Sequence, residues 1–128
     1  MQFKRNEGFR FVFNEPIDSS FKIIIDGNYV KPEIRHAGKI LDISPHGVKL
    51  FSEAQIGEYL NKTTLRMELQ FVLDVTMIEA VGEIMWTKPY MSGRQYGILF
   101  QSEEKIDELI IREMKLRRKK EMLDSKRR

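Results

Sequence analysis

The strongest constraint on the fold is a two-residue alternation of apolar side chains in the second half of the chain. It is clearest in residues 65–74, where the alternating apolar positions are Leu65, Met67, Leu69, Phe71 and Leu73. Successive side chains of a β-strand point to opposite faces, so this period predicts a strand with one face on a core. Residues 77–88 and 94–101 repeat the pattern, with a turn at 89–93 between them. Strands joined by short turns favour an antiparallel barrel or sandwich.

The first half of the chain continues this all-β pattern. Apolar residues alternate over 9–13, which predicts an extended stretch that ends at Glu15-Pro16. Asp26-Gly27-Asn28 is typical of a tight turn. Gly38 is expected at a bulge or a close approach of two backbones. The remaining predicted strands cover 20–26, 34–43 and 47–52, and residues 53–63 are expected to form a loop.

The C-terminal part has a helical period. Ser102, followed by acidic residues, is typical of a helix N-cap. The apolar residues after it form one helical stripe, which we expect to pack on the barrel: Ile106, Leu109, Ile110 and Met114. We therefore divide the chain into an N-terminal segment (1–14), a barrel (15–101) and a helix with a basic tail (102–128).

Composition excludes several classes of protein. The chain has no cysteine, which excludes a disulfide framework, a thiolate zinc site and a cysteine nucleophile. It has two histidines, too few for a histidine-rich metal site. No apolar run approaches the ~20 residues of a membrane span, and the first residues lack a signal-peptide core, so we expect a cytoplasmic protein. The net charge of +3 hides an asymmetry, since residues 112–128 carry nine basic and three acidic side chains. The other 111 residues have a net charge of −3, which argues against nucleic-acid binding by the barrel.

The basic tail has three interpretations: a solvated helix face, an electrostatic contact with nucleic acid or an anionic membrane, or a self-association helix. The apolar spacing after Met114 does not continue as heptads, which disfavours a coiled coil. A solvated, partly frayed helix end is the simplest expectation.

A polar corner lies between two predicted strands, at Ile40–Leu50. Asp42 and Ser44 are two residues apart, so they project from the same face of an extended chain, with Ile43 on the other. Pro45 fixes its own φ, and Gly47 can take a positive φ. Such a corner can bind a polar ligand, or it can be only a hydrogen-bonded turn.

Three motifs occur in a characteristic order: Asp42-Ile-Ser-Pro-His-Gly47, Gly82-Glu-Ile-Met-Trp86 and Tyr96-Gly-Ile-Leu-Phe100. In this order and spacing the chain resembles the PilZ domains, bacterial receptors for cyclic di-GMP. The resemblance implies a six-stranded antiparallel β-barrel with a C-terminal α-helix. It also implies that Asp42, Ser44 and Gly47 contact the ligand. Trp86 and the other aromatic residues are expected in the core.

The N-terminal segment departs from the family's Arg-x-x-x-Arg motif. If Arg10 is the second arginine, the first position falls on Asn6, with Arg5 one place earlier. If a bulge shifts the register, Arg5 can take the position of the first arginine, with Lys4 beside it. In strict register, one of the two arginines is absent. Arginine binds phosphate through a bidentate fork and pairs with guanine O6 and N7. Losing one such contact costs about 1.5–3 kcal/mol, so affinity would fall by about ten- to a hundredfold.

The resemblance therefore predicts a receptor for cyclic di-GMP that switches an interaction with an unidentified partner protein, in motility, envelope or biofilm control. Its expected ligand-binding residues are Lys4, Arg5, Asn6, Arg10, Asp42, Ser44 and Gly47. The alternative is a degenerate PilZ domain that binds no nucleotide and acts as an adaptor between proteins. The sequence contains no metal-ligand spacing, cofactor motif or nucleophile–base pattern, so we do not expect an enzyme.

Overall fold

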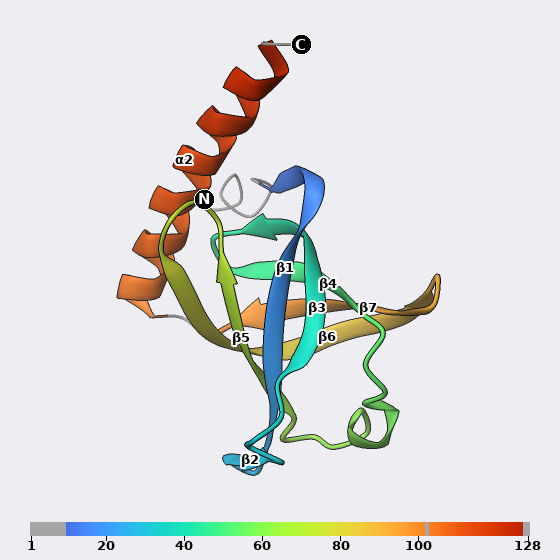
Figure 1. Cartoon of the computed structure of the whole chain (residues 1–128). Coiled ribbons are helices and arrows are strands. Elements are labelled where there is room, and N and C mark those ends of the chain that lie inside the picture. Colours follow the sequence, from blue (N-terminus) through green and yellow to red (C-terminus); the bar gives the residue numbers. More distant parts are fainter. Residues whose placement is uncertain (1–9, 102, 127–128) are drawn as a thin grey trace, which may run out of the picture.

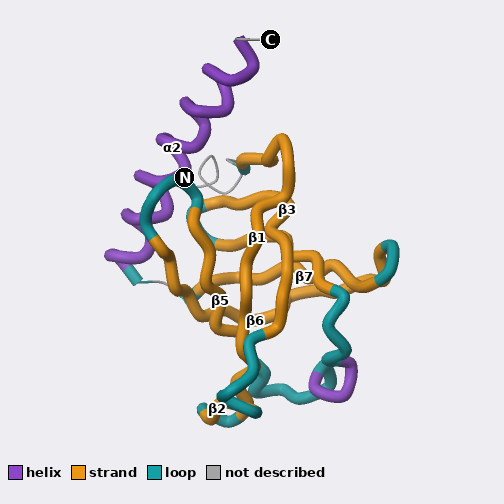
Figure 2. Tube along the Cα trace, viewed as in Figure 1, coloured by secondary structure: helices purple, strands orange, loops and turns teal. Residues whose placement is uncertain are grey.

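The computed structural model describes residues 10–101 and 103–126, of which 125 and 126 by their backbone only. Within these ranges, seven β-strands and a short 3-10 helix precede one long α-helix (Figures 1 and 2). The strands are β1 Phe11–Ile25, β2 Asn28–Val30, β3 His36–Ser44, β4 Gly47–Ser52, β5 Arg66–Val72, β6 Met77–Tyr90 and β7 Gly93–Phe100; the helices are η1 Gly57–Tyr59 and α2 Glu104–Lys126.

The strands pair in an antiparallel sheet that closes on itself. Their order is β2-β1-β3-β4-β7-β6-β5, and β1 also pairs with β5. Among the described strands, the three-residue β2 pairs only with β1, across the turn Asp26-Gly27, so the other six form a closed barrel. Asp26 and Gly27 both have positive φ, as a two-residue hairpin loop requires. The predicted six-stranded antiparallel barrel with a C-terminal helix is confirmed.

β1 is the strand on which closure depends, because it pairs with β3 on one side and with β5 on the other. It runs through Pro16, so the prediction that the extended stretch ends at Glu15-Pro16 is wrong. Pairing with β3 nevertheless shifts here, since Val12 faces Asp42 and Ile17 faces Ile40. The four residues between them lie opposite Leu41 alone and form an enlarged bulge. Proline lacks an N–H to donate, so a bulge accommodates it without loss of a ladder hydrogen bond.

The barrel interior is filled by the alternating apolar residues. Its fully buried members include Phe21, Ile40, Leu50, Leu69 and Tyr96. The alternation predicted for residues 65–74 is confirmed, since Leu65, Met67, Leu69, Phe71 and Leu73 are all buried. Alternate positions face outward, and Asp42 and Lys49 are among them.

Helix α2 packs along one side of the barrel and extends past its end (Figure 1). Ile110 and Met114 are buried, and Ile106 and Leu109 are partly buried against the core, which confirms the predicted apolar stripe. The helix continues to Lys126, so the expected fraying is not seen in the described residues. Ser102, the predicted N-cap, lies outside them. Among the described residues, no helix combines the length and apolar character needed to cross a lipid bilayer.

A buried carboxylate fixes α2 to the barrel. Glu113 is fully buried, and its Oε1 accepts backbone N–H bonds from Asp74, Val75 and Thr76 at 2.9, 3.0 and 3.1 Å. Burial opposes ionisation of this carboxyl, but the three backbone hydrogen bonds outweigh it and lower the pKa of Glu113. The sequence pattern did not indicate this anchor.

The next turn of α2 contacts the start of β1. Arg117 lies over the ring of Phe13 and donates to the carbonyl oxygen of Leu73 at 3.1 Å. Its partner Glu121 accepts the backbone N–H of Asn14 at 3.3 Å. The bulged part of β1 is thus held by the helix.

Candidate functional site

Four neighbouring strands place four of their residues in one row on the outer face of the barrel. In the observed register, Asp42 of β3 faces Lys49 of β4, Lys49 faces Gly97 of β7, and Gly97 faces Trp86 of β6. The row therefore contains a carboxylate, an ammonium group, a position without a side chain and an indole. Side chains opposite each other on one face of a sheet are within contact distance, so these groups form one surface.

Two bulges bring this row together. In β3 the pairing shifts at Leu41, so that Ile40 and Ile43 both point into the core and Asp42 points outward. In β6 the pairing shifts at Met85, which reverses the phase of the residues that follow. Bulges of this kind change the direction of a side chain and are frequent beside functional sites.

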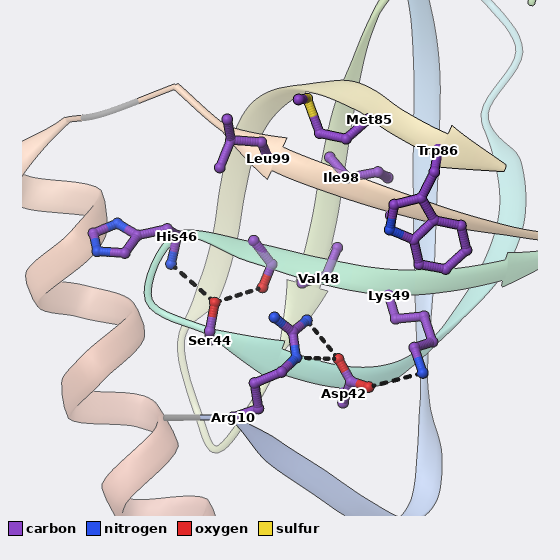
Figure 3. Close-up of a pocket in the computed structure, with 12 residues that line it drawn as sticks. Arg10, Asp42, Ser44, His46, Val48, Lys49, Met85, Trp86, Ile98 and Leu99 are labelled. Atoms are coloured by element: carbon purple, nitrogen blue, oxygen red, sulfur yellow. Dashed lines mark hydrogen bonds and ion pairs between the residues drawn. The ribbon is translucent and has the colours of Figure 1, made fainter. Parts of the chain in front are cut away.

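Asp42 is the centre of the charged side of the site. It is only 6% exposed, and its Oδ1 accepts hydrogen bonds from Arg10 Nη2 at 2.6 Å and Nε at 3.0 Å. Its Oδ2 lies 3.4 Å from Lys49 Nζ. Figure 3 shows Arg10 and Lys49 on either side of this carboxylate. Two cations face one anion, so these three groups leave a net charge of +1 to attract an anionic ligand.

The corner after Asp42 is closed by Ser44. Its hydroxyl accepts the backbone N–H of His46 at 3.3 Å and lies 3.5 Å from the carbonyl oxygen of Gly47, to which it donates. Gly47 does not have the positive φ that the sequence suggested. A glycine is required there for another reason: a Cβ would overlap the carbonyl oxygen of Ile98 on the adjacent strand.

The opposite side of the site is apolar, and it corrects one prediction. Trp86 was expected in the core, but it is 43% exposed because the bulge at Met85 turns it outward. Its indole lies over Gly97, where any Cβ would overlap Nε1. Met85 and Leu99 are also exposed beside it. The indole therefore presents a flat apolar surface to the same space that Asp42 borders.

Between the charged and apolar sides lies an open hollow of about 600 Å³. Arg10, Asp42 and Ser44 line one part, and Met85, Trp86 and Leu99 line another. This volume is within the range of small-molecule sites, and a mainly apolar wall with a few polar groups is typical of them. Among the described residues, no cluster of histidine, aspartate or glutamate could hold a metal ion.

The family model of the PilZ domain matches residues 2–116 of the chain. The chain belongs to the PilZ family. A search of curated proteins gave no match. Two of the solved structures that match illustrate the similarity in fold. The PilZ domain with c-di-GMP of YcgR from Escherichia coli has a TM-score of 0.67 at 9% identity, covering 92% of this chain and 95% of that one. The PilZ domain of CeSA from a cellulose-synthesizing bacterium has a TM-score of 0.51 at 16% identity, covering 81% and 92%.

The structure brings together four of the residues that the PilZ resemblance suggested: Arg10, Asp42, Ser44 and Gly47 all line the hollow. Lys4, Arg5 and Asn6 lie outside the described residues, so the altered Arg-x-x-x-Arg motif stays a prediction. The sequence reasoning missed Lys49 and the exposed side of Trp86. Lys49 could have been found, because it alternates with Gly47 on the outward face of a predicted strand.

Proposed function

We propose that this PilZ domain is a receptor for cyclic di-GMP, which binds in the hollow between Arg10 and Trp86. The observation that carries the proposal is that residues distant in sequence border the same hollow. Arg10, the Asp42–Ser44 corner and Trp86 are more than 30 residues apart in sequence, yet they border one hollow with a net positive charge. Cyclic di-GMP offers what such a hollow can bind: two phosphates and two guanine bases.

The charged side suits the polar parts of this ligand. The guanidinium of Arg10 can bind a phosphate, or guanine O6 and N7, through two parallel hydrogen bonds. The guanine N1–H and N2–H₂ groups are donors, for which the carboxylate of Asp42 is an acceptor. Asp42 already holds Arg10 at 2.6 Å, so the acid also orients the arginine toward the hollow.

The apolar side suits a purine face. A base stacked on an aromatic side chain gains about 1–3 kcal/mol, whatever its hydrogen-bonding pattern. Trp86 presents its indole beside the hollow, supported from below by Gly97. We infer that one guanine stacks on Trp86 while its edge faces the Asp42–Ser44 corner.

Residues 4–6 would complete the site. Lys4, Arg5 and Asn6 precede Arg10, and in this proposal Arg5 takes the place of the first family arginine. Ligand contact would fix the part of the N-terminal segment (1–14) that precedes β1 over the barrel (15–101) and change the surface offered to a partner protein. The domain would thus act as a cytoplasmic switch in motility, envelope or biofilm control, and not as an enzyme.

A second candidate function is favoured by one observation, the asparagine at position 6 in strict register with the family motif. In that case the domain binds no nucleotide and acts as an adaptor through its surface. The substitution Asn6→Arg would then create binding that the wild type lacks.

Calorimetric titration of the full chain with cyclic di-GMP tests the proposal. We expect saturable binding, and an affinity loss of about ten- to a hundredfold in Arg10→Ala, since a charge-assisted contact is removed. Arg66→Ala is the matched control, because Arg66 pairs with Glu83 on the barrel and does not line the hollow. A wild type that produces no heat and no thermal shift at saturating ligand would overturn the receptor proposal and favour the adaptor.

A further inference from the structure

Lys49 occupies the middle of the row that crosses the site. Its register partners are Asp42 on one side and Gly97 on the other. Since Gly97 has no side chain, the next group along the row is the Trp86 indole. Lys49 therefore lines the hollow between the Asp42 carboxylate and the Trp86 indole (Figure 3).

The contact that holds Lys49 is weaker than the one that holds Arg10. Lys49 Nζ is 3.4 Å from Asp42 Oδ2, beyond the usual length of a charge-assisted N–H···O bond, whereas Arg10 approaches Oδ1 to 2.6 Å. About a third of the Lys49 side chain is exposed. An ammonium group on a flexible four-carbon stem can move several ångströms at little cost. Lys49 is thus the cation that can leave Asp42 when a stronger anion arrives.

Charge balance indicates what that anion is. Arg10 and Lys49 are the two Lys or Arg residues among the described residues that line the hollow, and Asp42 neutralises one charge. A cyclic dinucleotide carries two phosphates, hence a charge of −2. Arg10 can serve one phosphate, and within the described residues the second phosphate has Lys49 as its nearest available cation in the hollow. Lys49 is in place to supply this charge from the barrel itself.

We propose that Lys49 is a phosphate ligand of this site. On binding, its ammonium group exchanges the Asp42 carboxylate for a phosphate oxygen, and Asp42 is freed to accept from the guanine edge. The inference rests on the proposed function and extends it, because it adds a cation of the barrel to those that the proposal assigns to the N-terminal segment. The N-terminal segment would then need to supply fewer phosphate contacts.

Calorimetric titration with cyclic di-GMP tests this in Lys49→Met, which keeps the stem and removes the charge. We expect an affinity loss of about tenfold or more, a weaker dependence of affinity on salt, and recovery of most of the affinity in Lys49→Arg. Lys39→Met is the matched control: Lys39 lies on the adjacent strand, pairs with Asp18 and does not line the hollow. Melting curves check that each variant is folded.

Phosphorus NMR of the bound ligand separates direct contact from an effect through Asp42. If Lys49 binds a phosphate, Lys49→Met shifts a ³¹P resonance of the bound ligand and Lys39→Met does not. Unchanged affinity in Lys49→Met, or lost affinity with unchanged ³¹P resonances, overturns the inference while the receptor proposal stands. Absence of wild-type binding overturns the receptor proposal itself, and the inference with it.

Discussion

The substitution Glu113→Gln should detach α2 partially from the barrel, and the structure allows the effect to be estimated. One oxygen of this buried carboxylate accepts three backbone N–H bonds, from Asp74, Val75 and Thr76. Glutamine keeps an acceptor oxygen at that position but removes the charge. A hydrogen bond to a charged group stabilises by about 1.5–3 kcal/mol and a neutral one by about 0.5–1.5 kcal/mol. Because the three bonds share one oxygen, their losses do not add. We expect Glu113→Gln to lower the unfolding free energy by about 1–2 kcal/mol in total.

The sign of the pH dependence follows from the lowered pKa of Glu113. Its pKa in the folded protein is below the unfolded value of 4.5, so the ionised carboxylate stabilises the fold. This contribution is fully present above pH 4.5 and is lost as the pH falls through the folded pKa. The difference in unfolding free energy between the wild type and Glu113→Gln should therefore be constant near neutral pH and shrink below pH 4.5.

Urea denaturation followed by circular dichroism at pH 7 and at several values below 4.5 measures this difference. Glu108→Gln is the control, since Glu108 is an exposed carboxylate on the same helix. Equal stability of Glu113→Gln and the wild type at pH 7 would refute the anchor. So would a difference that persists unchanged at acidic pH.

Three further perturbations test other parts of the structure. Gly97→Ala should displace the Trp86 indole and weaken ligand binding by about five- to a hundredfold, which is the range of one lost stacking contact. Titration would measure this loss, and urea denaturation should show little change in unfolding free energy. Trp86→Ala should weaken binding to a similar extent, while Trp86→Phe keeps most of the affinity, which the same titration compares. Arg35→Met leaves Glu68, which is 8% exposed, without its charged partner. Urea denaturation should show a loss of about 2 kcal/mol of unfolding free energy. A loss below 0.5 kcal/mol, the size of an ordinary surface substitution, would contradict this.

The fold could be predicted from the sequence because its main signal is local. The alternation of residues 65–74 is a property of one strand, and the turn residues Asp26-Gly27 act over four positions. Barrel closure adds a requirement that no local pattern contains, since β1 must pair with both β3 and β5. β1 continues through Pro16 by way of its bulge, whereas the sequence alone suggested a break.

The site was only half predictable for the same reason. Asp42 and Ser44 share a face by simple alternation, and the family motif assigned Arg10 to the same ligand site. The exposure of Trp86 did not follow, because it depends on the bulge at Met85. A strand without that bulge would keep Trp86 in phase with Ile84 and direct the indole inward, as the alternation predicted. Bulges depend on how neighbouring strands fit, so a single strand's pattern does not show them.

The bulge in β1 has a consequence for local opening of the domain. It divides the strand into two separately held parts: Phe11–Val12 on β3, and residues 17–25, which pair with β2, β3 and β5. The first part can separate from β3 while the second keeps the barrel closed, because no ladder pairing with β3 connects them. Backbone amides of the first part should therefore exchange hydrogen with solvent by local opening, and those at 19–24 only when the whole domain unfolds. The end of β1 that follows Arg10 is a small cooperative unit of its own, able to open and close on a barrel that stays folded.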